Sequence, residues 1–355
     1  MIIWLLVLFL SASCLAAPQE YLEIPTELQE LLPDTLEPVT MRKLLENPSP
    51  KEIFTSLWRY LWEEVRIHMK LIGQIIIIVV LAAIFKEIAL SFSKEAGEAG
   101  FLAAYLILIL LLVASLKDAA KITIETMTTL SNIIKILVPF VGSMALGGAI
   151  STTLTLSPLI IGLSATVAMI LEKLLIPLAL ASGVLGLASY VSKKPMLTRL
   201  SGFFRWLCLL ILGLVHTVFF GLITSLGLGS AAKDSLAFRT ARFIVGSVPI
   251  VGSQVASSAD LLQASTKAVQ SLGSGIGLLF LLFATLFPVL RLSSLVLVYK
   301  LLQAVIEPVA ETRFLGALGS MEKSITLFLA LLIISAVMFY LSVGVMASIG
   351  TFLMR

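Results

Sequence analysis

Ionisable side chains inside or beside apolar runs are the residues of this chain best placed to do chemistry, because a charge in a membrane span is costly. Lys300 lies inside an apolar run, and Glu307 follows two helical turns later on nearly the same face. Such residues can coordinate a solute, but a Lys300–Glu307 pair, or pairing to another helix, is the more frequent structural use. Lys86 lies at the end of one apolar run, and the neighbouring residues Glu172 and Lys173 lie at the end of another. At such positions a long side chain can reach the headgroups.

The other reactive side chains do not form a known catalytic or metal-binding set. His68 begins one apolar run and His216 lies within another. His216 suits either a proton relay or, more commonly, a neutral imidazole that bonds to a neighbouring helix. Gly227–Ser230 resembles the intramembrane aspartyl protease signature, but Ser230 replaces the required aspartate. The zincin, nucleophile-elbow and Walker motifs are also missing from the sequence. We therefore expect no catalytic residue, no cofactor and no metal.

The segment Phe238–Gly277 differs from the apolar sequence on either side, because it is half polar and rich in glycine. In lipid, backbone released from a helix must be satisfied by protein or by a water-lined cavity. The segment is therefore either a re-entrant element or a pair of interfacial helices packed on a bundle. Its candidate motif residues are Arg239, Arg242, Gly246, Pro249, Gly252, Asp260 and Lys267.

A short sequence in this segment occurs twice in the chain. Val248–Ser253 nearly repeats Val138–Ser143, with the shared pattern V-P-x-V-G-S. Internal repeats are common in membrane transport folds, where broken helices mark the functional centre. The repeat is either a true duplication or a coincidence in a chain rich in Val, Ile, Leu, Gly and Ser.

The composition is that of a polytopic membrane protein. Of 355 residues, 59% are hydrophobic and 13% are charged, whereas a soluble domain is about a quarter charged. The net charge is +4, but the basic residues are scattered at the ends of apolar runs, so no nucleic-acid partner is expected. Cys14 and Cys208 lie in separate apolar segments and indicate neither a disulfide framework nor a metal site.

The sequence predicts an all-α, polytopic membrane helix bundle with about 7–8 transmembrane helices plus amphipathic or re-entrant segments. The predicted divisions are 1–17, a signal peptide; 18–66, a short acidic extracytoplasmic arm; 67–232, transmembrane spans 1–6; 233–275, an amphipathic or re-entrant extracytoplasmic segment; and 276–355, a C-terminal transmembrane region. An uncleaved first span is the alternative to the signal peptide.

Three details of the span assignment are specific enough to test. After a span at Phe101–Leu116, the amphipathic stretch Lys117–Lys135 is predicted to be an interfacial helix. The uncharged residues between Lys135 and Glu172 are enough for two spans, with a break near Ser151–Thr153. Ile276–Leu290 is predicted to span, whereas Leu292–Ile306 is ambiguous because it contains Lys300.

Basic residues predict the orientation. The loop after the fifth predicted span is basic without any acid, which indicates the cytoplasmic side; its basic residues are Lys193, Lys194, Arg199 and Arg205. Counting crossings from this loop places residues 18–66 and 231–267 outside. Trp58, Tyr60 and Trp62, near the end of the acidic arm, are expected at the headgroup level.

The central segment resembles the signature region of the stage III sporulation protein AE family. Three stretches carry the resemblance: Phe238–Gly252, Ser258–Ser265 and Lys267–Val269. The chain departs from the family pattern in three ways, since the turn Gly246–Pro249 is one residue shorter, Ala268 replaces an expected asparagine, and the glycine-bearing element is displaced to Gly273. These departures leave any role of the Lys267 element open.

The resemblance implies a non-enzymatic function. Members of this family are membrane subunits of a channel-like complex, similar to a secretion system, between mother cell and forespore. It implies a multi-pass protein of the mother-cell membrane around the forespore, required for late forespore gene expression. The implied partners are the membrane, other subunits of the same sporulation operon and a forespore membrane partner. The alternative is a stand-alone transporter or permease, and an intramembrane enzyme is disfavoured by the missing catalytic sets.

Overall fold

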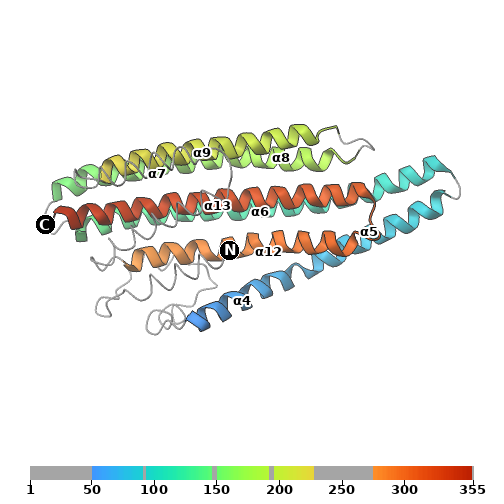
Figure 1. The fold of residues 1–355 in the computed structure, drawn as a ribbon, viewed down its shortest axis with the longest axis horizontal. Coiled ribbons are helices and arrows are strands. Elements are labelled where there is room, and N and C mark those ends of the chain that lie inside the picture. Colours follow the sequence, from blue (N-terminus) through green and yellow to red (C-terminus); the bar gives the residue numbers. More distant parts are fainter. Residues whose placement is uncertain (1–49, 91–92, 146–149, 192–195, 228–274, 354–355) are drawn as a thin grey trace.

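The computed structural model describes residues 50–90, 93–145, 150–191, 196–227 and 275–353, and every regular element in these ranges is a helix (Figure 1). The helices are α4 (Pro50–Ile67), α5 (Met69–Leu90), α6 (Lys94–Ala145), α7 (Ile150–Ile170), the π-helical turn η1 (Leu171–Leu175), α8 (Ile176–Ala188), α9 (Thr198–Gly227), α12 (Gly275–Ile306) and α13 (Thr312–Leu353).

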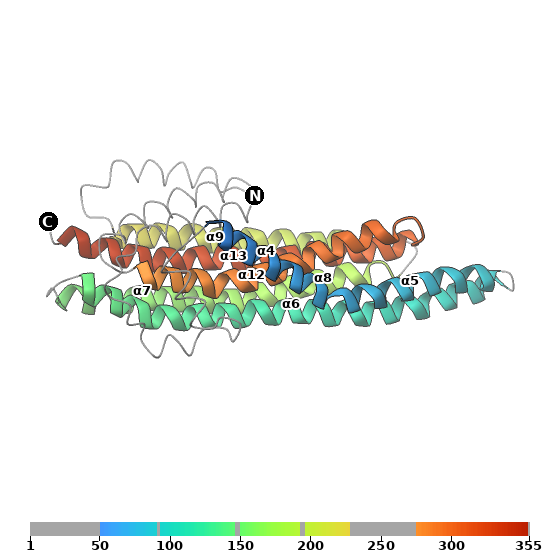
Figure 2. The same ribbon diagram turned by 90° about the horizontal axis from the view of Figure 1, so that it is seen from below.

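The helices lie along one long axis as a bundle (Figures 1 and 2). The turn at His68 separates α4 from α5, and η1 joins α7 to α8. The α5–α6 hairpin extends past the end of the bundle at which α8 and α12 finish (Figure 2). Within the described ranges, six helices are long and apolar enough to cross a membrane. The predicted all-α polytopic membrane fold is therefore confirmed.

Helix α13 forms the centre of the bundle and α5 lies at its edge. The most apolar window of α13 is 67% buried, against 17% for α5. Helix α13 packs against α6, α12, α8 and α9. Its contact with α8 is close because a Cβ at Gly183 would lie 3.2 Å from Ser324 Oγ, and a Cβ at Gly186 would collide with Ser320 Oγ. Small residues on α8 thus allow two backbones to approach.

The prediction of a separate interfacial helix at Lys117–Lys135 is wrong, because α6 runs without interruption from Lys94 to Ala145. No proline or glycine occurs between Phe101 and Leu137. Buried residues also recur at helical spacing on both sides of Lys117, so the same face of α6 continues along the bundle. These buried residues include Leu108, Leu112, Leu116, Ala119, Thr123, Met127, Leu130 and Leu137.

The prediction of two spans between Lys135 and Glu172 is also corrected. Among the described residues of this region the structure has one candidate span, Ile160–Ala188, and Glu172 lies inside it on η1. Pro177 cannot donate a backbone hydrogen bond and crowds the preceding turn; the wider π turn accommodates it. Leu171 and Leu175 stay buried while the charged residues of η1 face outward.

Residues Ile276–Leu290 and Leu292–Ile306 form a single helix, α12, which continues through Pro288. The chain therefore passes once through the bundle here. Three candidate passes, rather than five, now separate α4 from the end of α8. Because this number is also odd, the predicted orientation is unchanged and stays a prediction.

Candidate functional site

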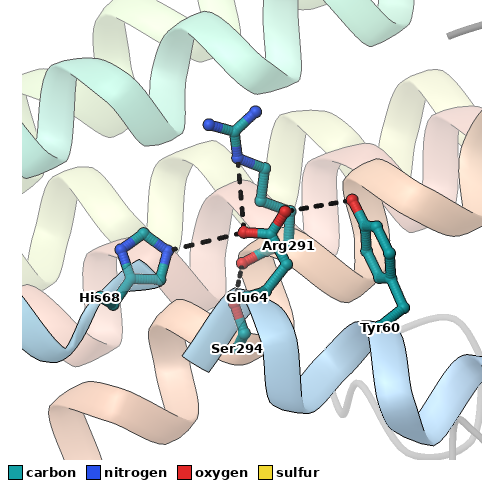
Figure 3. A network of polar contacts seen from close by, with 5 residues as sticks. All are labelled: Tyr60, Glu64, His68, Arg291 and Ser294. Atoms are coloured by element: carbon teal, nitrogen blue, oxygen red, sulfur yellow. Dashed lines mark hydrogen bonds and ion pairs between the residues drawn. The ribbon is translucent and has the colours of Figure 1, made fainter. Parts of the chain in front are cut away.

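A buried carboxylate, Glu64, holds three side chains where α4 meets α12 (Figure 3). The hydroxyl of Tyr60 donates a hydrogen bond to Glu64 Oε1 at 3.1 Å. Arg291 Nε of α12 lies 3.9 Å from Glu64 Oε2, and His68 Nε2 lies 4.0 Å from the same oxygen. One carboxylate therefore connects α4, the turn before α5 and α12.

The spacing of these residues explains the arrangement. Tyr60, Glu64 and His68 follow one another at intervals of four, so they share one helix face. The Tyr60 ring packs edge-on against Phe287 of α12 at a centroid distance of 4.8 Å. Ser294 Oγ donates to the Arg291 carbonyl at 2.7 Å, a bond within α12 (Figure 3). Packing and the carboxylate together orient α4 on α12.

The aromatic residues of α4 do not share one environment as the sequence predicted. Tyr60 faces the bundle, whereas Trp58 and Trp62 are 55% and 54% exposed. The two indole rings are nearly parallel, with centroids 6.4 Å apart. Of these three residues, Trp58 and Trp62 are the ones exposed at the surface of the bundle.

The charge of Glu64 is balanced by Arg291 rather than by His68. Burial lowers the pKa of His68 below its ordinary 6.5, Arg291 lowers it further, and Glu64 and Asp118 only partly oppose the shift. Burial, followed by the charge of Glu64, raises the pKa of Tyr60, which keeps the phenol a donor. Because the Arg291 side chain is 52% exposed, the ion pair contributes at most about 1 kcal/mol. The cluster is a clamp between helices.

A second carboxylate, Glu311, joins three helices at the end of the bundle. It precedes α13 and accepts hydrogen bonds from Lys86 Nζ of α5 at 3.2 Å and from Arg313 Nε at 2.9 Å. The Arg313 guanidinium lies 3.7 Å from the ring centroid of Phe101 on α6. Lys86 is thus part of an ion pair as well as being close to the end of its span.

Lys300 forms an ion pair with Glu322 of α13, with 3.7 Å between Nζ and Oε1. Of the two pairings predicted for Lys300, the structure contains the one with another helix. Glu307 lies just beyond the end of α12 and is exposed. The Lys300 side chain is 67% exposed, so the structure places it on the surface of the bundle rather than in an enclosed solute site.

His216 and Cys208 are buried on α9. The His216 ring lies nearly parallel to that of Phe220, with centroids 6.5 Å apart. Cys208 Sγ donates to the Leu175 carbonyl at 3.6 Å. In the part of the chain that the structure describes, no group of three or more His, Cys, Asp or Glu residues is placed to hold a metal ion.

The motif residues predicted in the central segment lie outside the described ranges: Arg239, Arg242, Gly246, Pro249, Gly252, Asp260 and Lys267. The first V-P-x-V-G-S copy, Val138–Ser143, lies in the last turns of α6, whereas the second copy falls in residues 228–274. The duplication therefore stays a prediction.

Comparison with known proteins identifies the family. The model of the family described as "Stage III sporulation protein AE" matches residues 39–350. The chain belongs to this family. A family member, the stage III sporulation protein AE of Bacillus subtilis (strain 168), is 26% identical over 338 residues, which cover 94% of this chain and 84% of that protein. No solved structure matches the chain.

Membership of the stage III sporulation protein AE family confirms the resemblance found in the central segment. Sequence reasoning missed the three carboxylates that hold the helices together, Glu64, Glu311 and Glu322. The sequence does indicate a role for Glu64, because Tyr60, Glu64 and His68 are spaced four residues apart and so lie on the same face of an amphipathic helix.

Proposed function

We propose that this chain is the polytopic membrane subunit of a channel complex between mother cell and forespore. It resides in the mother-cell membrane around the forespore, and it supports late forespore gene expression. Its partners are the other subunits of the same sporulation operon and a forespore membrane protein. The observation that carries the proposal is family membership over residues 39–350, together with the apolar helices of a multi-pass membrane protein.

The way in which the polar groups are used supports a structural, non-enzymatic role. Glu64, Glu311 and Glu322 each bind a cation from another helix at 3.2–3.9 Å. Each of these contacts fixes the relative position of two helices. A chain whose buried acid, Glu64, and partly exposed acids, Glu311 and Glu322, pair with cations of other helices fits a membrane platform better than a catalyst.

The alternative, a stand-alone transporter, depends on intramembrane charges that bind a solute. Lys300 is the candidate, and its exposure and its pairing with Glu322 favour the subunit proposal. Lys300→Ala separates the two functions. A transporter would lose solute movement while still assembling, whereas the platform would lose only one exposed ion pair and retain its function.

The experiment is a deletion of the gene in the sporulating host, complemented with the wild-type or the Lys300→Ala protein. We expect the deletion to abolish a late forespore reporter, and both proteins to restore it when membrane immunoblots show equal amounts. Normal reporter activity and normal spores in the deletion strain would overturn the proposal. Failure of Lys300→Ala alone, at wild-type abundance, would favour the transporter.

A further inference from the structure

Helix α6 is too long to lie within one bilayer. Its 52 residues extend about 78 Å at about 1.5 Å per residue, whereas the hydrocarbon core is about 30 Å thick. Less than half of the helix can therefore be in contact with acyl chains if it crosses steeply. The side chains that α6 exposes show which part this is.

The exposed face of α6 changes from apolar to polar at Lys117. Between Phe101 and Leu116 the exposed side chains are apolar, four of them large, and from Lys117 to Lys135 they are charged or hydroxylated. The apolar set is Leu102, Leu106, Ile107 and Leu110, and the polar set is Lys117, Asp118, Lys121, Glu125, Thr128 and Lys135. Both sets lie on one continuous helix and face away from the bundle, so a change of surroundings explains the switch better than a change of packing.

Helix α5 gives the same two boundaries. It is uncharged from Leu71 to Phe85, between Lys70 and Lys86. Its exposed apolar residues in and just after this stretch are Ile77, Val80, Leu81, Ile84, Phe85 and Ile88. Lys86 bonds to Glu311, and Arg313, which also binds Glu311, lies over Phe101 of α6. These contacts place Lys86, Arg313 and Phe101 at one level, which we call the near boundary.

The far boundary lies at Lys70, Lys117 and Arg291. Sixteen residues separate Lys86 from Lys70 (86 − 70) and Phe101 from Lys117 (117 − 101), which is about 24 Å along either helix. The Lys70 and Lys86 side chains can extend along the helix axis toward the headgroups. The length between the two charged groups is therefore close to the hydrocarbon thickness of about 30 Å. Arg291 lies near this level because it pairs with Glu64. Glu64 is one helical turn before His68, which is two residues before Lys70.

The π-helical turn η1 agrees with the far boundary. The exposed Glu172 and Lys173 of η1 lie 16 and 15 residues (188 − 172 and 188 − 173) before the end of α8, which finishes at the same end of the bundle as α12 (Figure 1). The Lys300–Glu322 ion pair lies between the boundaries with the Lys300 side chain 67% exposed, so the proposal requires that this charge be carried at the lipid-facing surface by its pairing with Glu322.

We propose that bilayer lipid covers only the half of the bundle between the near and far boundaries. The remainder stands outside the hydrocarbon on the side of α4: all of α4 and α7, α6 beyond Lys117 and α12 before Arg291. The exposed Trp58 and Trp62 of α4 then lie outside the hydrocarbon, past the far boundary and on the side of its headgroup layer. Helix α9 also exposes Val218 and Leu222 near or beyond this boundary, and the proposal requires that lipid does not cover Leu222.

The test is spin-label accessibility in the full chain, reconstituted in vesicles of phosphatidylglycerol and phosphatidylethanolamine. Both native cysteines, Cys14 and Cys208, are replaced by alanine. Single cysteines at Leu106, Leu110, Lys121, Thr128 and Leu222 then carry a nitroxide, with the buried Leu108→Cys as control. Oxygen concentrates in acyl chains and a nickel chelate stays in water, so the two relaxation agents distinguish lipid, water and protein interior.

We expect the labels at Leu106 and Leu110 to have an oxygen-to-nickel ratio several-fold above those at Lys121 and Thr128. Leu108 should be protected from both agents, and Leu222 should not show the lipid-type ratio. Lipid-type ratios at Lys121, Thr128 or Leu222 would overturn the proposal, as would water-type or protein-type accessibility at both Leu106 and Leu110. Two positions on each side of Lys117 keep the test decisive if one variant fails to fold.

Discussion

At the scale of single residues, the Glu64 carboxylate explains how an amphipathic helix is held against an apolar bundle. Its side chain is only 10% exposed, and a buried carboxylate is tolerated only when donors surround it. Tyr60 of α4 supplies a hydrogen-bond donor and Arg291 of α12 supplies a nearby positive charge. Loss of the Tyr60 hydroxyl should therefore lower the free energy of unfolding by more than a change at an exposed residue of α4.

Tyr60→Phe removes the hydroxyl donor to Glu64 and leaves the aromatic packing on Phe287. We expect it to lower the free energy of unfolding by about 1–2 kcal/mol. Thermal unfolding of the detergent-solubilised protein, followed by circular dichroism, measures the change. The matched control is Trp62→Phe, an exposed aromatic residue on the same helix, for which little change is expected. Equal shifts in the two variants would contradict a role for the hydroxyl.

His68 predicts a pH dependence of stability. Its folded-state pKa is lowered by burial, so below about pH 6.5 the unfolded chain binds more protons than the native chain, and stability falls as the pH falls. The groups facing His68 are Glu64, Arg291 and Asp118. His68→Asn should therefore lose less thermal stability than wild type between about pH 7 and about pH 5.5. Parallel losses in the two proteins would show that His68 does not contribute.

At the scale of helices, ion pairs and small residues determine the packing. Arg313 is 13% exposed and combines an ion pair to Glu311 with a contact on the Phe101 ring. Lys86 is 36% exposed and pairs with Glu311 at 3.2 Å. We expect Arg313→Gln to lower the melting temperature more than Lys86→Gln, because the cation is better desolvated and has two partners. The reverse order would contradict this assignment.

Gly186 tests the close approach of α8 to α13. A Cβ there would collide with Ser320 Oγ and lie 3.1 Å from Ser201 Oγ. Gly186→Ala should destabilise the protein, and Ser320→Ala in the same chain should restore part of the loss. The control is Gly162→Ala, because a Cβ at Gly162 meets nothing within 4 Å and alanine favours a helix by up to about 1 kcal/mol. Thermal unfolding of the four proteins compares them.

Local pattern predicted the existence of the helices but not their ends or partners. The apolar runs Ile67–Ala89, Trp206–Leu228 and Ile325–Met354 predict spans, and the structure has candidate spans in α5, α9 and α13 there, since length and hydropathy determine them. The change in exposed polarity at Lys117 predicts the end of a span, whereas α6 continues through it from Lys94 to Ala145. The sequence near Tyr60 predicts a place at the headgroups, but in the structure the ring faces the bundle. This orientation depends on Phe287 and Arg291, which are more than 200 residues away in the sequence and so invisible to local pattern. Lys300 had two possible partners, and only the packing of α12 on α13 selects Glu322.

At the scale of the whole molecule, the parity of the passes determines its orientation. The ends of α8 and α9 lie at opposite ends of the bundle (Figure 1). With the basic loop after α8 in the cytoplasm, the C-terminal end of α9 is extracytoplasmic. An alkaline phosphatase fusion at Gly227 should therefore be active and one at Ala188 inactive, at equal abundance. The opposite pattern would invert the bundle.

The central claim is that the chain acts as a platform within a multi-subunit membrane complex. The most direct measurement is affinity purification of a functional tagged copy from membranes of the sporulating host after engulfment, followed by mass spectrometry. A mock-tagged strain and an unrelated tagged multi-pass protein serve as controls. We predict specific recovery of other membrane proteins of the same sporulation operon together with a forespore membrane protein. Recovery of the tagged chain alone, from cells that form normal spores without it, would contradict the account.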